Sequence, residues 1–247
     1  MVLFADIGTS SIKLYKEDSS LKIFPNNRTD KLKSFLNFIN PHTIIISSVS
    51  KTGLNTLKNA LKGIKTVVLD HASEFSFKID IENPETVGID RLLNIESVLY
   101  HSLSTNFIVI DAGSGITIDV VCNCEGKAVF KGGLIIPGEY LQYKSLVNNT
   151  DIKDIEKQVI HNGIIGKNTK HAITSGIKNC LLYGIEGIIL KLVSEYKIDN
   201  IVITGRGSEF LKDNKDALKI KTGLNIVFND KLIYSGFVSM AKKLKIK

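Results

Sequence analysis

The sequence VLFADIGTSSIKLY, residues 2–15, recurs in altered form as FIVIDAGSGITIDVV, residues 107–121. Each copy begins with an apolar run, continues with Asp-x-Gly and a hydroxyl residue, and ends in a run of alternating character. Asp6 corresponds to Asp111, and the glycines and hydroxyl residues that follow correspond at the same offset. An internal repeat of this kind indicates duplicated subdomains. The alternative is coincidence, because Asp-x-Gly turns are common in hairpins.

The segments that follow each copy predict the same order of elements. After the first copy come a strand-like LKIF, a helix with Leu32, Phe35 and Leu36 on one face, the apolar strand TIIISSV, and a second helix. After the second copy come the strand KAVFKGG, a long helix over about residues 169–196, and the strand NIVITGRG. Three antiparallel strands followed by alternating helices and strands, twice, are typical of the actin-like arrangement.

The sequence therefore predicts an α/β protein of actin-like (ribonuclease H-like) fold. We expect two similar subdomains, residues 1–104 and 105–247, each with a mixed five-stranded sheet flanked by helices. The length and the 43% apolar content are sufficient for a substantial core.

Charge and cysteine content limit the classes of partner. The formal charge of +7 favours anionic ligands, but the lysines are spread along the chain, so phosphate-bearing substrates explain the charge as well as nucleic acid would. Cys122, Cys124 and Cys180 are odd in number and form no zinc-ligand pattern, so we expect reduced thiols. No leader or membrane span is expected, because charged residues interrupt the most apolar helical stretch. These features predict a soluble cytoplasmic protein.

The two Asp-x-Gly turns carry the chemistry of a nucleotide site. Glycine allows a ligand to approach the backbone, and successive N–H groups can bind an anion. A carboxylate at a strand end can hold hydrated Mg²⁺. Residues 201–207, IVITGRG, end a third strand in glycines and could accept the adenosine, or could form an ordinary strand-to-helix turn.

A further motif, NPETVGIDRLLNIESVLY, lies between the two turns at residues 83–100. Its simplest interpretation is a helix start with Asp90 as N-cap. A carboxylate there could also act as general base toward a substrate hydroxyl, and Arg91 could bind an anionic group.

The same motif resembles the substrate motif of type III pantothenate kinases. DAGSGITIDVV, GGLIIPGEYLQYKSL (residues 132–146) and GKNTKHAITSGI (residues 166–177) resemble further motifs of that family in the family's order. The resemblance covers roughly residues 2–241. It implies ATP-dependent phosphorylation of pantothenate to 4′-phosphopantothenate, the first step of coenzyme A biosynthesis.

The resemblance also implies roles for individual residues, with Asp90 as the catalytic proton acceptor. The ATP-binding residues would be Asp6, Ile7, Gly8, Thr9, Ser10, Ser11, Ile12, Lys13 and Ser114. The substrate-binding residues would be Gly88, Ile89, Asp90, Arg91 and Thr169. Asp111 would hold a monovalent cation, K⁺ or NH₄⁺, and Asp6 would hold hydrated Mg²⁺ that accompanies ATP. The family is homodimeric, and neither a membrane nor a nucleic acid is expected as a partner.

The chain departs from the family pattern at four positions. Thr9 replaces the usual asparagine, Ser114 a threonine, Ile81 stands about where many members have a tyrosine, and Arg206 replaces a glycine. Two alternatives stay open from the sequence. One is another actin-like small-molecule kinase, which would not need the NPETVGIDR motif. The other is a weakened family member that acts as a transcriptional accessory factor.

Overall fold

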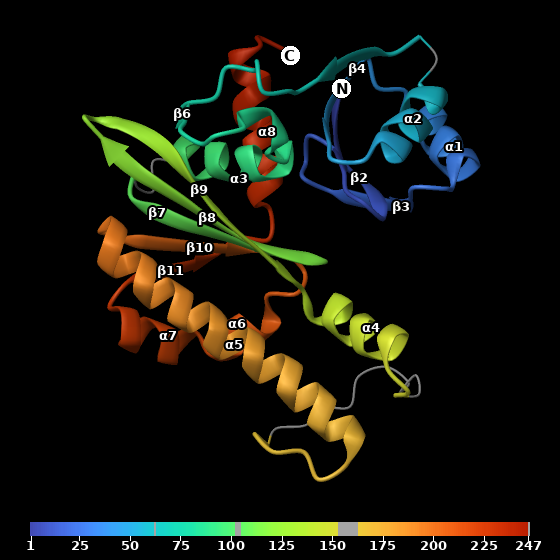
Figure 1. The fold of residues 1–247 in the computed structure, drawn as a ribbon. Coiled ribbons are helices and arrows are strands. Elements are labelled where there is room, and N and C mark those ends of the chain that lie inside the picture. Colours follow the sequence, from blue (N-terminus) through green and yellow to red (C-terminus); the bar gives the residue numbers. More distant parts are fainter. Residues whose placement is uncertain (62, 102–104, 153–162, 247) are drawn as a thin grey trace. The chain divides into compact units, whose positions relative to one another are not determined.

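The computed structural model describes residues 1–61, 63–101, 105–152 and 163–246 (Figure 1). The chain divides into two compact units. Unit 1 comprises Met1–Leu103, Lys127–Val129 and Lys231–Lys247, and unit 2 comprises Ser104–Gly126 and Phe130–Asp230. The expected boundary adjoins residues 102–104, which lie outside the described ranges, and it stays a prediction. The C-terminal segment was expected in the second subdomain, whereas its contacts group it with unit 1.

Unit 1 is built around a five-stranded sheet of order β3-β2-β1-β4-β5. β1 pairs antiparallel with β2 and parallel with β4. Its elements are β1 (Val2–Ile7), β2 (Ser11–Tyr15), β3 (Leu21–Pro25), α1 (Thr29–Ile39), β4 (Thr43–Ser48), α2 (Lys51–Ala60), β5 (Lys65–Val68), β6 (Lys78–Ile79), a 3-10 turn (Pro84–Thr86), α3 (Ile89–Tyr100) and α8 (Leu232–Lys243).

Both faces of the unit 1 sheet are covered by helices, because β1 is apolar on both sides. Leu3, Ala5 and Ile7 pack with the apolar residues of α1 and α2. Phe4 alternates with them and stacks on Phe237 of α8, with ring centroids 5.4 Å apart. Figure 1 shows α8 beside α3, so these two helices form a second layer.

Unit 2 repeats the strand order of unit 1. Its sheet runs β11-β10-β7-β8-β9, with β7 antiparallel to β8 and parallel to β10. Its elements are β7 (Phe107–Ala112), β8 (Gly115–Cys124), β9 (Lys127–Pro137), α4 (Glu139–Asn149), α5 (Thr169–Tyr196), β10 (Asn200–Thr204), α6 (Glu209–Asp213), α7 (Lys215–Thr222) and β11 (Asn225–Phe228). The first residues of β9, Lys127–Val129, belong to unit 1 and lie beside β6, a sixth strand that was not expected.

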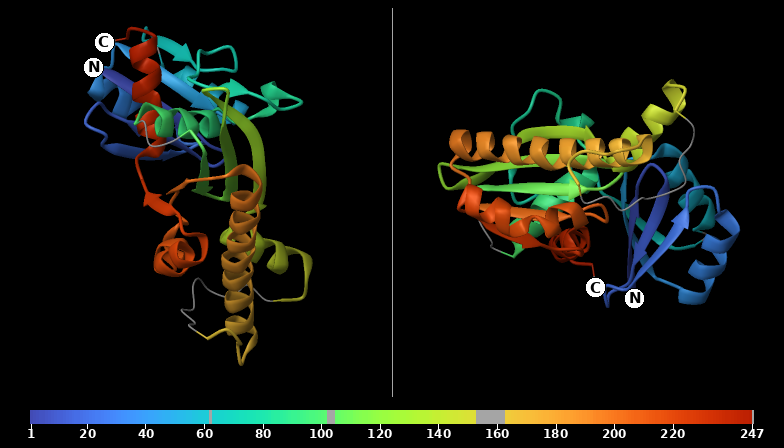
Figure 2. Two further views of the ribbon diagram at one scale, coloured as in Figure 1. Left: turned by 90° about the vertical axis from the view of Figure 1, so that its left-hand side faces the viewer. Right: turned by 90° about the horizontal axis from the view of Figure 1, so that it is seen from below.

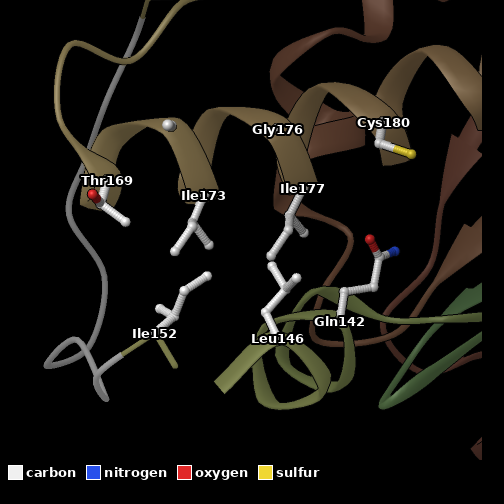
Figure 3. Close-up of a pocket in the computed structure, with 9 residues that line it drawn as sticks. Gln142, Leu146, Ile152, Thr169, Ile173, Gly176, Ile177 and Cys180 are labelled. Carbon is white, nitrogen blue, oxygen red and sulfur yellow. The ribbon is translucent and has the colours of Figure 1, made fainter. Parts of the chain in front are cut away.

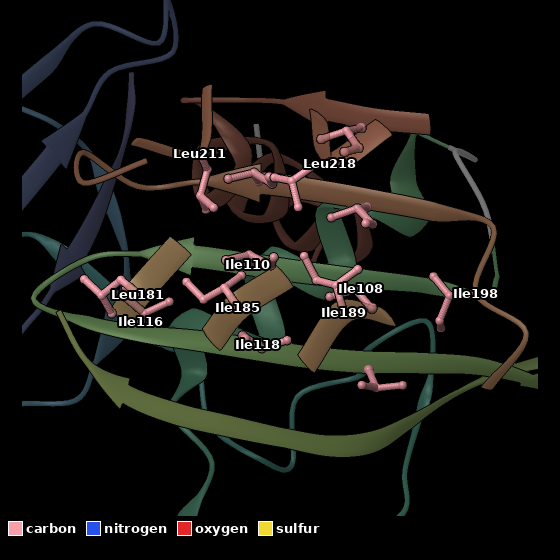
Figure 4. Packing of buried hydrophobic residues seen from close by; sticks show 14 of the residues in the cluster. Ile108, Ile110, Ile116, Ile118, Leu181, Ile185, Ile189, Ile198, Leu211 and Leu218 are labelled. Carbon is pink, nitrogen blue, oxygen red and sulfur yellow. The ribbon is translucent and has the colours of Figure 1, made fainter. Parts of the chain in front are cut away.

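The core of unit 2 lies between its sheet and α5. Figure 2 shows α5 extending along the sheet and past its end. In Figure 4, Leu181, Ile185 and Ile189 of α5 face the isoleucines of β7 and β8, among them Ile108 and Ile118. The long helix therefore has the expected bounds, and its apolar face fixes β7 and the turn that follows it. No helix within the described residues is long and apolar enough to cross a membrane.

Candidate active site

The first Asp-x-Gly turn joins β1 to β2 in unit 1. Asp6 is 4% exposed and lies directly opposite Lys13 in the strand pairing. The Lys13 ammonium contacts the Asp6 carboxylate at 2.8 Å. Gly8 closes the turn by donating its N–H to the Ser11 carbonyl at 3.0 Å. Ile7 lies in the core and is fully buried, so only its backbone could contact a nucleotide.

The substrate motif forms the start of α3, also in unit 1. Its N-cap is Gly88, so the expected N-cap at Asp90 is wrong, and Asp90 lies in the first turn. The Asp90 carboxylate accepts the N–H of Arg91 at 2.9 Å. A Cβ on Gly88 would lie 2.3 Å from Oδ1 of Asp90. Glycine at position 88 therefore leaves the space that this carboxylate occupies, at a helix end that favours negative charge.

Val49 brings the first turn and the start of α3 together, a link that the sequence pattern did not indicate. Its N–H donates to the Ile7 carbonyl at 3.0 Å, directly before Gly8. Its Cγ1 lies 3.2 Å from the position that a Cβ on Gly88 would take. On the other side of the motif, His71 Nε2 contacts the Val87 carbonyl at 2.8 Å. The turn around Gly8, expected to bind ATP, and the Gly88–Arg91 motif, expected to bind substrate, are thus neighbours within unit 1, whereas Ser114 and Thr169 lie in unit 2.

We predict that Gly88→Ala lowers kcat with little loss of stability. The backbone of Gly88, at φ −61° and ψ 132°, is open to alanine, so the new methyl group displaces the Asp90 carboxylate rather than the chain. A displacement of about 1 Å near the chemistry can cost about 10²-fold. Steady-state kinetics and thermal unfolding of the variant check this. An unchanged kcat would show that the position of the Asp90 carboxylate beside Gly88 does not affect catalysis.

A buried carboxylate lies farther along α3. Glu96 is fully buried and accepts from the Lys243 ammonium at 2.8 Å, from Ser239 Oγ at 2.7 Å and from the Ser76 N–H at 2.7 Å. Burial raises the pKa of Glu96, but the hydrogen bonds from Lys243, Ser239 and Ser76 outweigh burial and hold the pKa below its usual value. Lys243 also donates to the Glu74 carbonyl at 2.9 Å. This ion pair joins α3, α8 and the segment before β6.

The second Asp-x-Gly turn lies at the end of β7 in unit 2, and glycines of two other segments meet it. Asp111 is opposite Thr117 of β8 and beside Thr204 of β10. A Cβ on Gly205, where φ is +95°, would lie 2.6 Å from the backbone of Ala112. The next turn residues continue this contact, since the Gly207 N–H donates to the Ala112 carbonyl at 2.8 Å.

The segment between β9 and α4 also approaches this turn. The Gly138 N–H donates to the Ser114 carbonyl at 2.9 Å, and a Cβ on Gly138 would lie 2.6 Å from that oxygen. The expected second phosphate turn and the expected adenosine segment therefore come together in unit 2. A side chain at Gly205 would push these two segments apart, and one at Gly138 would push the β9–α4 segment away from the phosphate turn.

Thr169 lies elsewhere in unit 2, as the exposed first residue of α5. The side chain of Asn168 caps this helix by accepting the His171 N–H at 2.9 Å. Thr169 lines a cavity of about 380 Å³ between α4 and α5. Figure 3 shows Leu146 and Ile152 facing Ile173 and Ile177 across it. The cavity is mainly apolar, and the hydroxyl residue Thr169 is part of its lining.

Comparison with solved structures defines the class of protein. Over 98% of both chains, a protein of Campylobacter jejuni assigned to the Baf family of transcriptional activators superposes with a TM-score of 0.63 at 21% identity. A Sinorhizobium meliloti protein assigned as a 2-dehydro-3-deoxygalactonokinase gives 0.60 at 13% identity over 99% of both chains. The archaeal actin homolog Ta0583 gives 0.53 at 11% identity over 100% of this chain and 99% of its own. These similarities confirm the predicted actin-like α/β fold.

The sequence comparisons define the family within that class. Residues 2–191 match the model of the type III pantothenate kinase family. A type III pantothenate kinase of a Sulfurihydrogenibium species is 31% identical over 234 residues, which covers 87% of this chain and 91% of the relative. That of Flavobacterium johnsoniae is 30% identical over 217 residues, which covers 85% and 88%. The chain belongs to the type III pantothenate kinase family, as its motifs predicted, and is a transferase.

Proposed function

We propose that the chain transfers the γ-phosphoryl group of ATP to the primary hydroxyl of pantothenate, the first step of coenzyme A biosynthesis. The observation that carries this proposal is the junction at Val49, which holds the Asp6–Lys13 turn beside the Gly88–Arg91 motif. Phosphoryl transfer needs donor and acceptor groups fixed close together, because most of its acceleration comes from positioning and charge neutralisation. Family membership favours this activity over a transcriptional accessory role.

The residues around Asp6 fit a divalent metal that accompanies ATP. Mg²⁺ is usually held by one or two carboxylates, waters and the substrate phosphates, so a single carboxylate is sufficient. Ser47 lies beside Asp6 in the parallel pairing, and its Oγ is buried with no hydrogen-bond partner among the described residues. We propose that Asp6 holds hydrated Mg²⁺, which would neutralise phosphate charge, while Ser47 offers an oxygen to that water shell.

The residues around Asp111 fit a monovalent cation. Thr117 is paired with Asp111 across β7 and β8, so their side chains share a face of the sheet. Thr117 Oγ1 is buried and has no hydrogen-bond partner within the described ranges. A carboxylate and an unused hydroxyl are suitable oxygen ligands for K⁺ or NH₄⁺. We propose that Asp111 and Thr117 hold this ion, which would add positive charge near the phosphates.

The other residues have roles in the reaction itself. Asp90 accepts the proton of the pantothenate hydroxyl while the hydroxyl oxygen forms the new bond to the γ-phosphorus. The bond between the γ-phosphorus and the bridging oxygen of ATP breaks, and ADP is released. Arg91 binds the acceptor's carboxylate. Ser114 contacts ATP, and Thr169 contacts pantothenate from the edge of the α4–α5 cavity.

A direct assay tests the proposed function. The purified protein is incubated with Mg-ATP and pantothenate in K⁺, NH₄⁺ or Na⁺, and 4′-phosphopantothenate is detected by mass. We expect product with K⁺ or NH₄⁺ and less with Na⁺. Absence of product with every cation would refute the proposed function, and equal rates in all three would refute the cation site.

We further propose a homodimer in the cytoplasm. Exposed apolar side chains of α4 and α5 support self-association, with Tyr140 60%, Leu141 44% and Tyr183 52% exposed. Among the residues that the structure describes, no atom lies within 4 Å of the Cβ positions of Gly184 and Gly187 of α5, so another helix could approach closely. A metabolic kinase family is consistent with a cytoplasmic location.

A further inference from the structure

One residue outside the recognised motifs, Asn26, binds the carbonyl groups of the first Asp-x-Gly turn. Asn26 follows β3, and its Nδ2 donates to the Gly8 carbonyl at 3.0 Å and to the Thr9 carbonyl at 2.9 Å. Its backbone N–H donates to the Ser10 carbonyl at 3.3 Å. The three successive carbonyl oxygens of the turn are therefore all occupied by donors from a single residue.

This arrangement determines which polar groups the turn can present. A carbonyl oxygen pointing at a phosphate would repel it, whereas backbone N–H groups attract it. The Gly8 N–H is used within the turn. The N–H groups of Thr9 and Ser10 have no backbone or side-chain acceptor within the described residues, and both residues are exposed. With its carbonyls held by Asn26, the turn presents amide donors to solvent.

Asn26 is itself held in place from α2. Thr56 Oγ1 donates to the Asn26 carbonyl at 2.8 Å. A Cβ on Gly53 would lie 3.1 Å from Asn26 Oδ1, so glycine leaves room for the amide. The opposite amide orientation would place Oδ1 against two carbonyl oxygens, so the two donor contacts determine which way the group points. Asn26 Oδ1 is buried without a hydrogen-bond partner among the described residues. This orientation of the amide therefore costs the desolvation free energy of one carbonyl oxygen.

We propose that Asn26 is a positioning residue for nucleotide binding, which fixes the turn Gly8–Ser10 with the N–H groups of Thr9 and Ser10 directed at the phosphates of ATP. The proposal rests on the proposed function for the identity of the donor. It assigns Asn26 no contact with the reacting atoms. Its effect is expected on the affinity for the nucleotide, not on the affinity for pantothenate.

The test compares Asn26→Asp and Asn26→Ala with wild type. Aspartate keeps the shape but replaces the donor by a charged acceptor that repels the Gly8 and Thr9 carbonyls, and alanine removes the donor without adding charge. We expect KM for ATP to rise about tenfold in N26A and further in N26D, with KM for pantothenate within about twofold. Thr56→Val, which removes the anchor of Asn26, should raise KM for ATP by a smaller factor. Thermal unfolding identifies any variant that is not folded. If N26D does not fold, the test uses N26A alone.

The matched control is Asn214→Asp. Its Nδ2 also donates to one carbonyl, that of Phe210 at 2.8 Å, but in unit 2 at the end of α6. This variant should keep both KM values. Equal rises of both KM values in N26A, or an unchanged KM for ATP, would overturn the proposal.

Calorimetric titration with Mg-ATP separates this proposal from the proposed function, because it requires no turnover. If wild type binds Mg-ATP and forms no 4′-phosphopantothenate, the proposed function fails, while weaker binding by N26A still supports the role of Asn26. If N26A binds Mg-ATP as tightly as wild type, the role of Asn26 is refuted whatever the acceptor. If wild type binds no nucleotide, both proposals are refuted.

Discussion

Asp90→Asn should reduce kcat by about 10²–10⁴-fold and leave the fold intact, the range expected when a general base is removed. Asparagine fills the same space above Gly88 and can still accept the Arg91 N–H through its side-chain oxygen. It cannot take a proton from the hydroxyl of pantothenate. The loss should therefore appear in kcat, while KM for ATP changes little.

The control for this variant is Glu82→Gln. Glu82 carries an exposed carboxylate directly before the motif and loses its charge in the same way. Steady-state kinetics of both variants, with thermal unfolding as a check, make the comparison. Turnover by Asp90→Asn near the wild-type rate would remove Asp90 from the role of base.

Lys243→Met should destabilise the protein by about 3 kcal/mol at neutral pH. Removing one partner of a buried ion pair costs about 3–5 kcal/mol, because the other charge stays buried without its counter-ion. We expect the lower end, since the Lys243 side chain is 30% exposed whereas that of Glu96 is fully buried. For a chain of this size, that corresponds to a fall in Tm of about 6–12 °C.

The pH dependence identifies Glu96 as the cause. Because the folded-state pKa of Glu96 is lowered, its contribution to stability is present above the ordinary glutamate value of 4.5 and is lost as pH falls through the folded-state pKa. The gap between wild type and Lys243→Met should therefore narrow below about pH 4.5. Denaturant unfolding at pH 7 and at pH 4 measures it. A gap that is the same at both pH values would show that Lys243 acts through packing alone.

An exposed ion pair supplies the control. Lys191 and Glu195 are 3.0 Å apart on α5, with side chains 73% and 47% exposed. Exposed pairs of this spacing contribute only a few tenths of a kcal/mol, so Lys191→Met should be close to wild type at both pH values.

The succession of elements along the chain and the bounds of α5 could be predicted from the sequence, because they depend on local patterns. Apolar runs, Asp-x-Gly turns and a helical apolar face are each visible within about thirty residues. The duplicated turns at Asp6 and Asp111 predicted an actin-like fold with mixed sheets, whereas the order β3-β2-β1-β4-β5 and its repeat come from the structure. The roles of Asp90, Arg91, Ser114 and Thr169 stay predictions from family resemblance.

The contacts that the sequence did not reveal join residues far apart in the chain. Val49 binds the Ile7 carbonyl and lies beside Gly88, and Asn26 binds Gly8 and Thr9, but neither Val49 nor Asn26 lies in a motif with a known chemical role. In the sequence, Glu96 resembles an ordinary charged residue on a helix, because the local pattern does not indicate its ion pair with Lys243. The N-cap was misplaced because Asp is a common cap, whereas here Gly88 is the N-cap and the Asp90 carboxylate lies over it from the first turn of α3.

The position of α8 has a consequence for the order in which the chain can fold during synthesis. Unit 1 uses the first hundred residues of the chain and also α8, which supplies Phe237 for Phe4 and Lys243 for Glu96. The ribosome releases these partners only after all of unit 2. The helix that carries Asp90 therefore lacks its packing layer until unit 2 has been synthesised, while unit 2 can fold first.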